Sequence, residues 1–181
     1  MTSPAALDAL LDEHIREIAD FPKPGVGFKD ITPLLADAQA FAATIDALAE
    51  LGRATCPGGI DHVVGMEARG FILAAPVALA LGAGFVPVRK HGKLPAPTYD
   101  VSYALEYGEA TLEVHRDAFG PGDKVLLVDD VLATGGTVQA TAELVARCGA
   151  TAVGVVVLLE LSFLSGRRKL GDLPFGSLRR L

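Results

Sequence analysis

The sequence predicts an α/β fold in which a mainly parallel sheet is flanked by helices. Short apolar runs alternate with segments of helical periodicity along most of the 181 residues, and short turns join them. One apolar run is followed by two acids and a glycine-rich turn that opens a helix, an order typical of open parallel sheets. No internal repeat or low-complexity segment interrupts the alternation. We therefore expect one domain, long enough to bury a single core.

The N-terminal quarter of the chain predicts two helices separated by a loop. After Ser3 and Pro4, a good cap and first-turn pair, helical spacing is shown by Leu7, Leu10, Leu11, His14, Ile15 and Ile18. Residues 21–28 are rich in proline and glycine, which indicates a loop. A second amphipathic helix is predicted across 41–48, with its end near Gly52.

The alternation of strands and helices follows this second helix. The predicted strands are 60–64, 85–88, 110–115, 125–128 and 151–159, and the predicted helices are 70–81 and a segment containing Val138, Leu144 and Val145. In 110–115 apolar and polar residues alternate, so we expect one solvent-exposed face, which includes Glu113. Residues 90–107 have no clear periodicity, and long structureless loops in compact domains are usually functional. We expect a mobile lid from about residue 93 to residue 107.

Composition argues against several classes of protein. The formal net charge of −6 does not suit a protein that grips nucleic acid electrostatically. The longest apolar stretch, 71–81, is too short to cross a bilayer, and we expect no membrane association and no signal peptide. Cys56 and Cys148 lie far apart and the four histidines lack metal-ligand spacing. We therefore expect free thiols, no protein-held metal and a cytoplasmic location.

The most informative segment is 125–137, where an apolar strand leads into a turn of small residues. Backbone N–H groups in such a turn converge on one space, and the following helix adds positive potential there, which creates an anion site. Gly135 and Gly136 allow a phosphate to approach the backbone beside Ala133, and the hydroxyls of Thr134 and Thr137 add donors. A kinase-type phosphate loop would need a Gly-Lys-Ser/Thr sequence, which is absent. The segment predicts a phosphate site.

Two acids precede this turn, Asp129 and Asp130, and they would repel a phosphate unless they bind something else. Ionised carboxylates are pure acceptors, and a ribose 2′,3′-diol offers two hydroxyl donors one sugar length from its 5′-phosphate. The segment therefore predicts a ribose 5-phosphate site. Its pattern resembles the signature of the type I phosphoribosyltransferases, carried by Asp129, Asp130, Thr134, Gly135, Gly136 and Thr137.

A donor with a leaving diphosphate needs a second anion site. Arg69 lies in a turn that follows a predicted strand and precedes a helix, and a guanidinium can chelate phosphate oxygens. Arg89, Lys90 and Lys93 lead into the aperiodic stretch. We expect all four cations to bind diphosphate, three of them from the base of the lid.

The resemblance extends to the adenine-specific branch of this family through four further segments: 21–33, 67–71, 89–95 and 105–108. It implies a type I phosphoribosyltransferase fold with a core over about 36–160 and a small hood from about 21–35 and 161–181. It also implies a homodimer and Mg²⁺ held mainly through 5-phosphoribosyl diphosphate (PRPP) and water. By the same resemblance the adenine-binding residues are Gly27, Phe28 and Lys29, and Glu106 and Tyr107 lie on the lid near the reacting centre, with Glu106 as a catalytic candidate beside Arg69, Asp129 and Asp130.

The implied activity is transfer of the phosphoribosyl group from PRPP to adenine, which gives AMP and diphosphate. Two alternatives remain open from the sequence. One is a relative that uses guanine, hypoxanthine, xanthine or orotate. The other is a non-catalytic regulator that senses PRPP, although retention of Arg69, the lid cations and Glu106 favours an enzyme.

Overall fold

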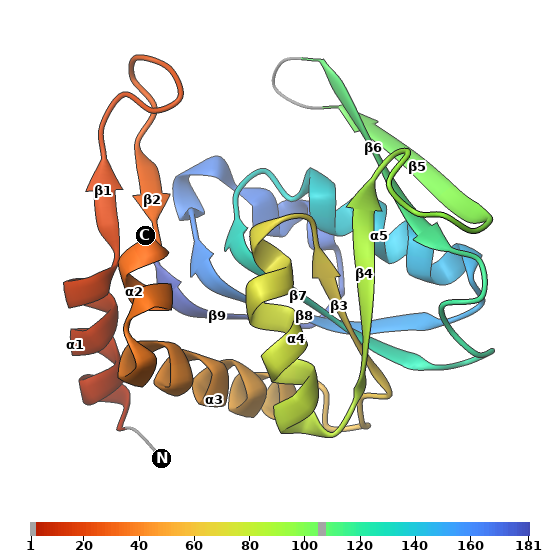
Figure 1. Ribbon diagram of the computed structural model, residues 1–181, viewed down its shortest axis with the longest axis horizontal. Helices are drawn as coiled ribbons and strands as arrows, with labels where there is room; N and C mark the ends of the chain where they lie inside the picture. Colours follow the sequence, from red (N-terminus) through yellow and green to blue (C-terminus); the bar gives the residue numbers. More distant parts are fainter. Residues whose placement is uncertain (1–2, 105–107) are drawn as a thin grey trace. The chain divides into compact units, whose positions relative to one another are not determined.

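The computed structural model describes residues 3–104 and 108–181, and the chain divides into two compact units, Met1–Ala47 and Leu48–Leu181 (Figure 1). The first unit contains α1 (Pro4–His14), β1 (Arg16–Ile18), β2 (Phe28–Asp30) and α2 (Thr32–Ala36). The long helix α3 (Ala38–Thr55) begins in the first unit and ends in the second.

Helix α1 begins as the sequence predicts but ends earlier. The Ser3 hydroxyl accepts a hydrogen bond from the Ala6 backbone N–H at 3.3 Å, and Pro4 is the first helical residue. The predicted helix was wrong from Ile15 onward, because Ile15 is extended and Arg16–Ile18 pairs antiparallel with Phe28–Asp30. Pairing with a distant strand here outweighs the local helical periodicity.

Gly52 does not end α3, which continues to Thr55. A Cβ atom at Gly52 would lie 2.9 Å from Leu126 Cδ2 and 3.7 Å from Leu81 Cδ1. The glycine therefore allows close packing of the helix within the second unit, and it acts as a contact residue rather than a stop signal.

The second unit is built on a seven-stranded sheet with the order β5-β6-β4-β3-β7-β8-β9. Its strands are β3 (His62–Met66), β4 (Gly84–Lys90), β5 (Thr98–Ala104), β6 (Glu109–His115), β7 (Lys124–Leu132), β8 (Thr151–Glu160) and β9 (Phe175–Arg180). Strands β4, β3, β7, β8 and β9 are parallel to one another, whereas β6 pairs antiparallel with β4 and with β5. The predicted α/β class with a mainly parallel sheet is confirmed.

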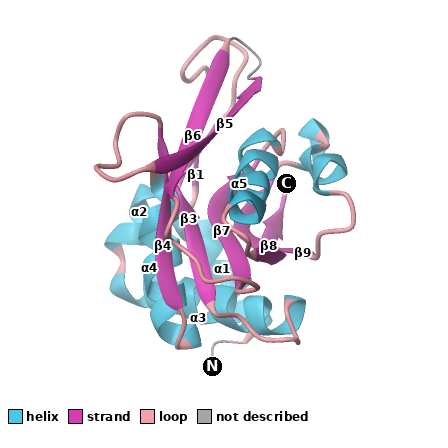
Figure 2. Cartoon of the chain, turned by 90° about the vertical axis from the view of Figure 1, so that its right-hand side faces the viewer, coloured by secondary structure: helices cyan, strands magenta, loops and turns pink. Residues whose placement is uncertain are grey.

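Helices cover both faces of this sheet. Helix α4 (Arg69–Leu81) packs on one face and α5 (Gly136–Arg147) on the other, as Figure 2 shows. Two short 3₁₀ helices, η1 (Ser162–Leu164) and η2 (Gly166–Leu170), follow β8. The central strands are apolar on both faces, as expected of covered parallel strands: residues 125–128 and 155–159 are fully buried.

Two sequence predictions for the sheet were wrong. Residues 98–104, predicted to lack regular structure, form β5, which pairs with β6 in a hairpin at the sheet edge (Figure 1). Glu113, predicted on the solvent-exposed face of its strand, is only 2% exposed. The division into core and hood stays a prediction, and the structure adds that β9, at the C-terminal end of the chain, pairs with β8. Within the described residues, no helix is long and apolar enough to cross a membrane.

Candidate functional site

The candidate site lies where β3 and β7 end. These strands are parallel neighbours with Gly65 opposite Val128, so the loop that begins at Glu67 and the acids that begin at Asp129 emerge at the same edge of the sheet. Ligands of open α/β sheets bind outside the carboxyl ends of the strands. The structure therefore brings together, in one unit, the two anion sites that the sequence predicts separately.

The phosphate loop runs from Ala133 to Thr137 and delivers the chain into α5. Gly135 has φ +80, a left-handed conformation that favours glycine, and it precedes the first helical residue, Gly136. A Cβ atom at Gly135 would lie 2.5 Å from the carbonyl oxygen of Gly166, and one at Gly166 would lie 2.1 Å from that of Ala133. Backbone contact between η2 and the loop thus supports the turn at the N-terminus of α5, where the sequence predicts the anion site.

The two acids before the loop have different surroundings. Asp130 is 6% exposed, and its Oδ2 lies 2.6 Å from Arg69 Nη2. The Asp130 backbone N–H donates to Asp129 Oδ1 at 2.9 Å. A Cβ atom at Gly70 would lie 2.7 Å from that same oxygen, so the glycine at the start of α4 makes room for the carboxylate.

Burial raises the pKa of Asp129 well above its ordinary value, and the neighbouring charge of Asp130 raises it further. The backbone N–H of Asp130 and the charge of Arg69 act in the opposite direction without cancelling the effect. Two adjacent carboxylates with one guanidinium, which lies beside Asp130, are short of positive charge. This arrangement suits a ligand that becomes cationic when it reacts.

Glu67 organises the cations of the predicted diphosphate site. Its Oε1 lies 2.6 Å from Lys93 Nζ, and its Oε2 lies 3.3 Å from Arg89 Nε and accepts the Lys90 backbone N–H at 3.0 Å. Arg89 also donates to the Lys93 carbonyl at 3.1 Å. Burial alone would raise the pKa of Glu67, but the hydrogen bonds and charges of these three residues lower it to about 2. Glu67 is therefore an ionised anchor for the cation-bearing loop.

Glu113 anchors the same loop from β6. Its Oε1 accepts the backbone N–H groups of Lys93 and Leu94, each at 2.7 Å, and its Oε2 accepts that of Gly92 at 3.0 Å. Burial raises the pKa of Glu113, but the three N–H groups outweigh it, so the pKa lies below its ordinary value. The loop that carries Lys93 is thus tied to two buried carboxylates on different elements.

The predicted adenine-binding residues belong to the first unit. Phe28 opens β2, and its ring meets that of Phe21 edge-on with centroids 5.1 Å apart. Lys29 Nζ lies 2.9 Å from Glu17 Oε2, and a Cβ atom at Gly27 would lie 3.2 Å from Glu17 Oε1. The β1–β2 ribbon therefore fixes these three residues relative to one another. Glu106 and Tyr107, the predicted lid residues, lie outside the described residues.

The acidic side chains near the end of β7 fit a Mg²⁺ ion that they contact indirectly. Asp130 Oδ2 is buried and receives no directed hydrogen bond from the described residues, although Arg69 lies beside it. Mg²⁺ prefers carboxylate, phosphate and water oxygens. His91, Asp100 and Glu113 offer a second group of atoms that could bind a metal, and these atoms lie within 4.8 Å of one another. Both Glu113 oxygens, however, already accept backbone N–H groups.

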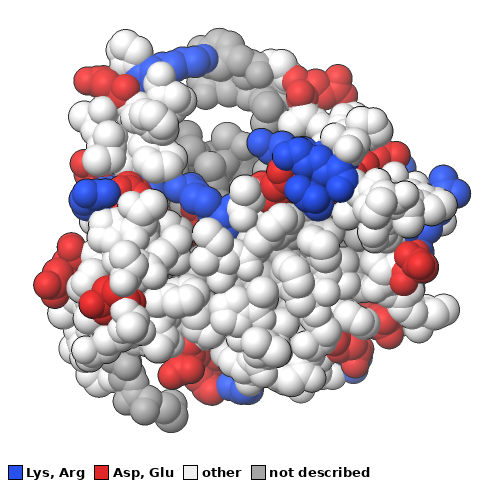
Figure 3. Space-filling model, in the orientation of Figure 1, with Lys and Arg blue, Asp and Glu red and all other residues white. Residues whose placement is uncertain are grey.

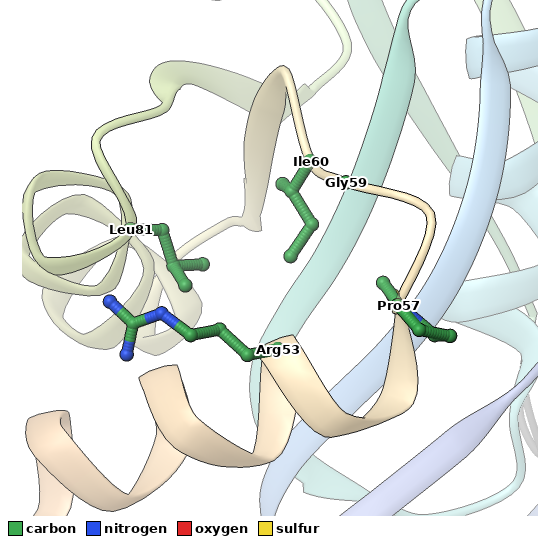
Figure 4. A pocket seen from close by; sticks show the side chains of 6 residues that line it. Arg53, Pro57, Gly59, Ile60 and Leu81 are labelled. Carbon is green, nitrogen blue, oxygen red and sulfur yellow. The ribbon is translucent and has the colours of Figure 1, made fainter.

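A cavity of about 270 Å³ lies at the other end of β3 and offers no comparable chemistry. Figure 4 shows Arg53 extending from α3 toward Leu81, with Ile60 on the opposite wall. The Arg53 guanidinium donates to the Ala80 carbonyl at 2.6 Å and pairs with Glu50. The cavity lies at the amino ends of the parallel strands, and its cation is already engaged, so we do not assign a ligand to it.

Four residues of the site received no role from the sequence: Glu67, Tyr103, Glu113 and Gly166. Glu67 lies inside a motif that pointed to the family, so a signal was present. Tyr103 belongs to an alternating run with Tyr99 and Val101, which indicates a strand but not its contact with the phosphate loop. Gly166 makes its contact across 31 residues of chain, and no local pattern reports such a contact.

Comparison with known proteins finds similar chains that cover most of this sequence. A model of the phosphoribosyl transferase domain matches residues 34–169. An adenine phosphoribosyltransferase of Nocardioides sp. is 64% identical over 165 residues, which cover 91% of this chain and 89% of that protein. The crystal structure of adenine phosphoribosyltransferase from Thermoanaerobacter pseudethanolicus is 48% identical with a TM-score of 0.92, covering 97% of this chain and 99% of that one. The Saccharomyces cerevisiae enzyme, solved with an imino-altritol bisphosphate and adenine, is 38% identical with a TM-score of 0.92 over the same shares of the two chains.

Proposed function

The chain belongs to the phosphoribosyltransferase family, in its adenine phosphoribosyltransferase branch, and we propose that it transfers the 5-phosphoribosyl group of PRPP to adenine. The products are AMP and diphosphate, so the enzyme salvages a free purine base. The observation that carries this proposal is the joint placement of the two acids near the end of β7, the phosphate loop before α5 and Arg69 at one edge of the sheet.

The ribose 5-phosphate half of the substrate occupies the end of β7. The backbone N–H groups of 133–137, with the hydroxyls of Thr134 and Thr137, bind the 5′-phosphate. Asp129 and Asp130 accept hydrogen bonds from the 2′- and 3′-hydroxyls. The raised pKa of Asp129 supports this role, because a carboxylate short of positive charge gains most when the ribose becomes cationic.

The diphosphate is the leaving group. As the C1′–O bond breaks, its electron pair leaves with the diphosphate, and positive charge develops on the ribose ring. Arg69, Lys90 and Lys93 stabilise the departing charge, and Arg89 supports the loop that carries the two lysines. Asp129 and Asp130 would lie near a Mg²⁺ ion held through PRPP oxygens and water, and that ion would supply positive charge against the diphosphate.

Adenine binds at the β1–β2 ribbon of the first unit. The Phe28 ring contacts the base, and the backbone groups of Gly27 and Lys29 bind its edge. N9 forms the new bond to C1′ and loses its proton, and Glu106 accepts or positions that proton. The S. cerevisiae relative, solved with adenine, supports a base site in this family.

The protein acts as a homodimer in the cytoplasm. Helix α4 exposes Leu79 to 83% and Ile72 to 43%, and Phe85 on the adjacent β4 is 37% exposed. Arg69 is the one charged residue of α4, and Figure 3 shows few charged side chains over most of that helix. An apolar patch of this kind is typical of an interface. The cytoplasmic location rests on two free cysteines.

The proposal is tested by mixing the protein with Mg²⁺, PRPP and adenine and measuring AMP and diphosphate. Parallel assays with hypoxanthine, guanine, xanthine and orotate test the base. A site shaped for the adenine amino group leaves buried groups unpaired when a carbonyl replaces it, so adenine should be preferred by a large factor. Comparable catalytic efficiency with another base would refute adenine as the substrate, and PRPP binding without any transfer would indicate a regulator.

A further inference from the structure

A hydrogen bond joins the edge hairpin of the sheet to the phosphate loop. The Tyr103 hydroxyl, near the end of β5, lies 3.1 Å from the hydroxyl oxygen of Thr137, in the first turn of α5. The Tyr103 ring also lies against the turn itself, because a Cβ atom at Gly136 would be 2.9 Å from Tyr103 Cδ2. Tyr103 is thus a neighbour of two residues of the phosphate loop.

The chemistry of this pair fixes the direction of the hydrogen bond when phosphate binds. A threonine hydroxyl has one proton to donate and two lone pairs that accept. Phosphate oxygens accept hydrogen bonds, so Thr137 must give its proton to the phosphate. The Thr137 oxygen then accepts, and the Tyr103 O–H is the donor within reach of it.

We infer that Tyr103 is a positioning residue for the 5′-phosphate, which it recognises through Thr137. This inference rests on the proposed function, because it takes Thr137 as a phosphate ligand. Tyr103 orients the Thr137 hydroxyl toward the anion and makes it a stronger donor, since hydrogen bonds in a chain polarise one another. Because Tyr103 acts through Thr137, its effect should be confined to ligands with a 5′-phosphate.

The chain offers a matched control on the same strand. Tyr99 lies four residues before Tyr103, on the same face of β5, and its ring stacks under the Arg116 guanidinium at 5.0 Å from the centroid. Tyr99→Phe and Tyr103→Phe each remove one hydroxyl and leave the ring in place. The two variants therefore differ in whether the lost hydroxyl faces Thr137.

The test is calorimetric binding of ribose 5-phosphate and, separately, of diphosphate with Mg²⁺. Tyr103→Phe should weaken ribose 5-phosphate binding about fivefold to tenfold and leave diphosphate binding unchanged, whereas Tyr99→Phe should change neither. In a Thr137→Val background, Tyr103→Phe should weaken ribose 5-phosphate binding little further. In a Thr137→Ser background, which keeps a hydroxyl, Tyr103→Phe should again weaken it by most of the wild-type amount. Equal weakening of both ligands, unchanged ribose 5-phosphate binding, or full additivity with Thr137→Val would each overturn the inference.

These binding measurements need no turnover, so they separate this inference from the proposed function. Wild-type protein that binds ribose 5-phosphate through Tyr103 but makes no AMP would refute the enzyme and keep the Tyr103 role. Wild-type protein that makes AMP, together with a Tyr103→Phe variant that binds ribose 5-phosphate normally, would support the enzyme and refute the Tyr103 role.

Discussion

The Lys93 ammonium lies 2.6 Å from the Glu67 carboxylate, so a residue predicted to bind diphosphate is paired with an anion of the protein itself. The same carboxylate contacts Arg89 and the Lys90 backbone. A carboxylate beside a diphosphate site repels the diphosphate. This repulsion is offset if the carboxylate keeps the cations in place before the substrate arrives.

Replacement of Glu67 by glutamine should therefore impair diphosphate recognition. We expect Glu67→Gln to raise KM for PRPP about fivefold, because Lys93 and Arg89 lose their charged anchor, and to leave KM for adenine unchanged. Steady-state kinetics with each substrate varied in turn measure this. Tighter diphosphate binding in the variant would instead show that Glu67 competes with the substrate for Lys93.

Acid stability should depend on the two anchoring carboxylates. Both Glu67 and Glu113 have folded-state pKa values below the ordinary 4.5, with that of Glu67 at about 2. Their contribution to stability is therefore complete above about pH 4.5 and is lost as the pH falls toward 2. Urea denaturation across this range should show a steep loss in wild-type protein and a shallower one in a Glu67→Gln, Glu113→Gln variant. Parallel curves would contradict the role of these carboxylates.

Asp129 and Asp130 should respond oppositely to neutralisation. Because the pKa of Asp129 is raised, its ionised form opposes folding at neutral pH, and Asp129→Asn should stabilise the free protein. Asp130→Asn should destabilise it, because the Arg69 guanidinium loses the charge of the carboxylate beside it. Thermal denaturation measures both effects.

Turnover should fall in both aspartate variants, because both carboxylates face the ribose as it becomes cationic. In Asp130→Asn, kcat should fall more than the affinity for AMP. Unchanged turnover in the double variant Asp129→Asn, Asp130→Asn would remove the diol assignment altogether.

The phosphate loop should not tolerate a methyl group at Gly135. Gly135 and Gly122 both have positive φ, +80 and +82, but only the Gly135 methyl would meet a backbone atom, Gly166 O at 2.5 Å. Gly122→Ala should cost about 1 kcal/mol from backbone strain alone. Gly135→Ala should cost about 2 kcal/mol more and abolish ribose 5-phosphate binding. Equal effects of the two substitutions would exclude the contact with Gly166 as the cause.

The dimer should depend on the apolar surface of α4. Leu79→Glu places a charge on an exposed residue, so the folded protomer should remain stable while the assembly dissociates. Light scattering measures the mass. Glu109→Lys, a charge change on an exposed residue of the edge hairpin, serves as the control and should leave the mass unchanged. A monomeric wild-type protein, or a dimeric Leu79→Glu variant, would contradict this interface.

The sequence predicts the parallel core well because its signal is local. Residues 125–128 are apolar and continuous, and the turn that begins after Leu132 contains Gly135, whose left-handed conformation favours glycine. Strand β5 was missed although Tyr99, Val101 and Tyr103 alternate, because residues 90–107 as a whole lack a clear periodicity and follow a cluster of cations.

The contacts that complete the site depend on residues far apart in the chain. The pattern around Glu113 gives the strand correctly, but its burial depends on a loop about 20 residues earlier that folds over it. The bond between Tyr103 and Thr137 spans 34 residues, and composition or periodicity does not report such a pair. Local patterns in the sequence therefore indicate candidate ligand-binding residues more readily than the residues that hold them in place.

The backbone contact between Gly135 and Gly166 also has a consequence for synthesis on the ribosome. The phosphate loop is made about 30 residues before the segment that supports it, and β9, which completes the sheet, is made later still. A nascent chain can therefore form the buried strands while its phosphate loop still lacks the backbone behind it. Substrate can assist only the final stage of folding, after residue 166 has left the exit tunnel, so PRPP should protect the finished chain from proteolysis but not a chain arrested at β8.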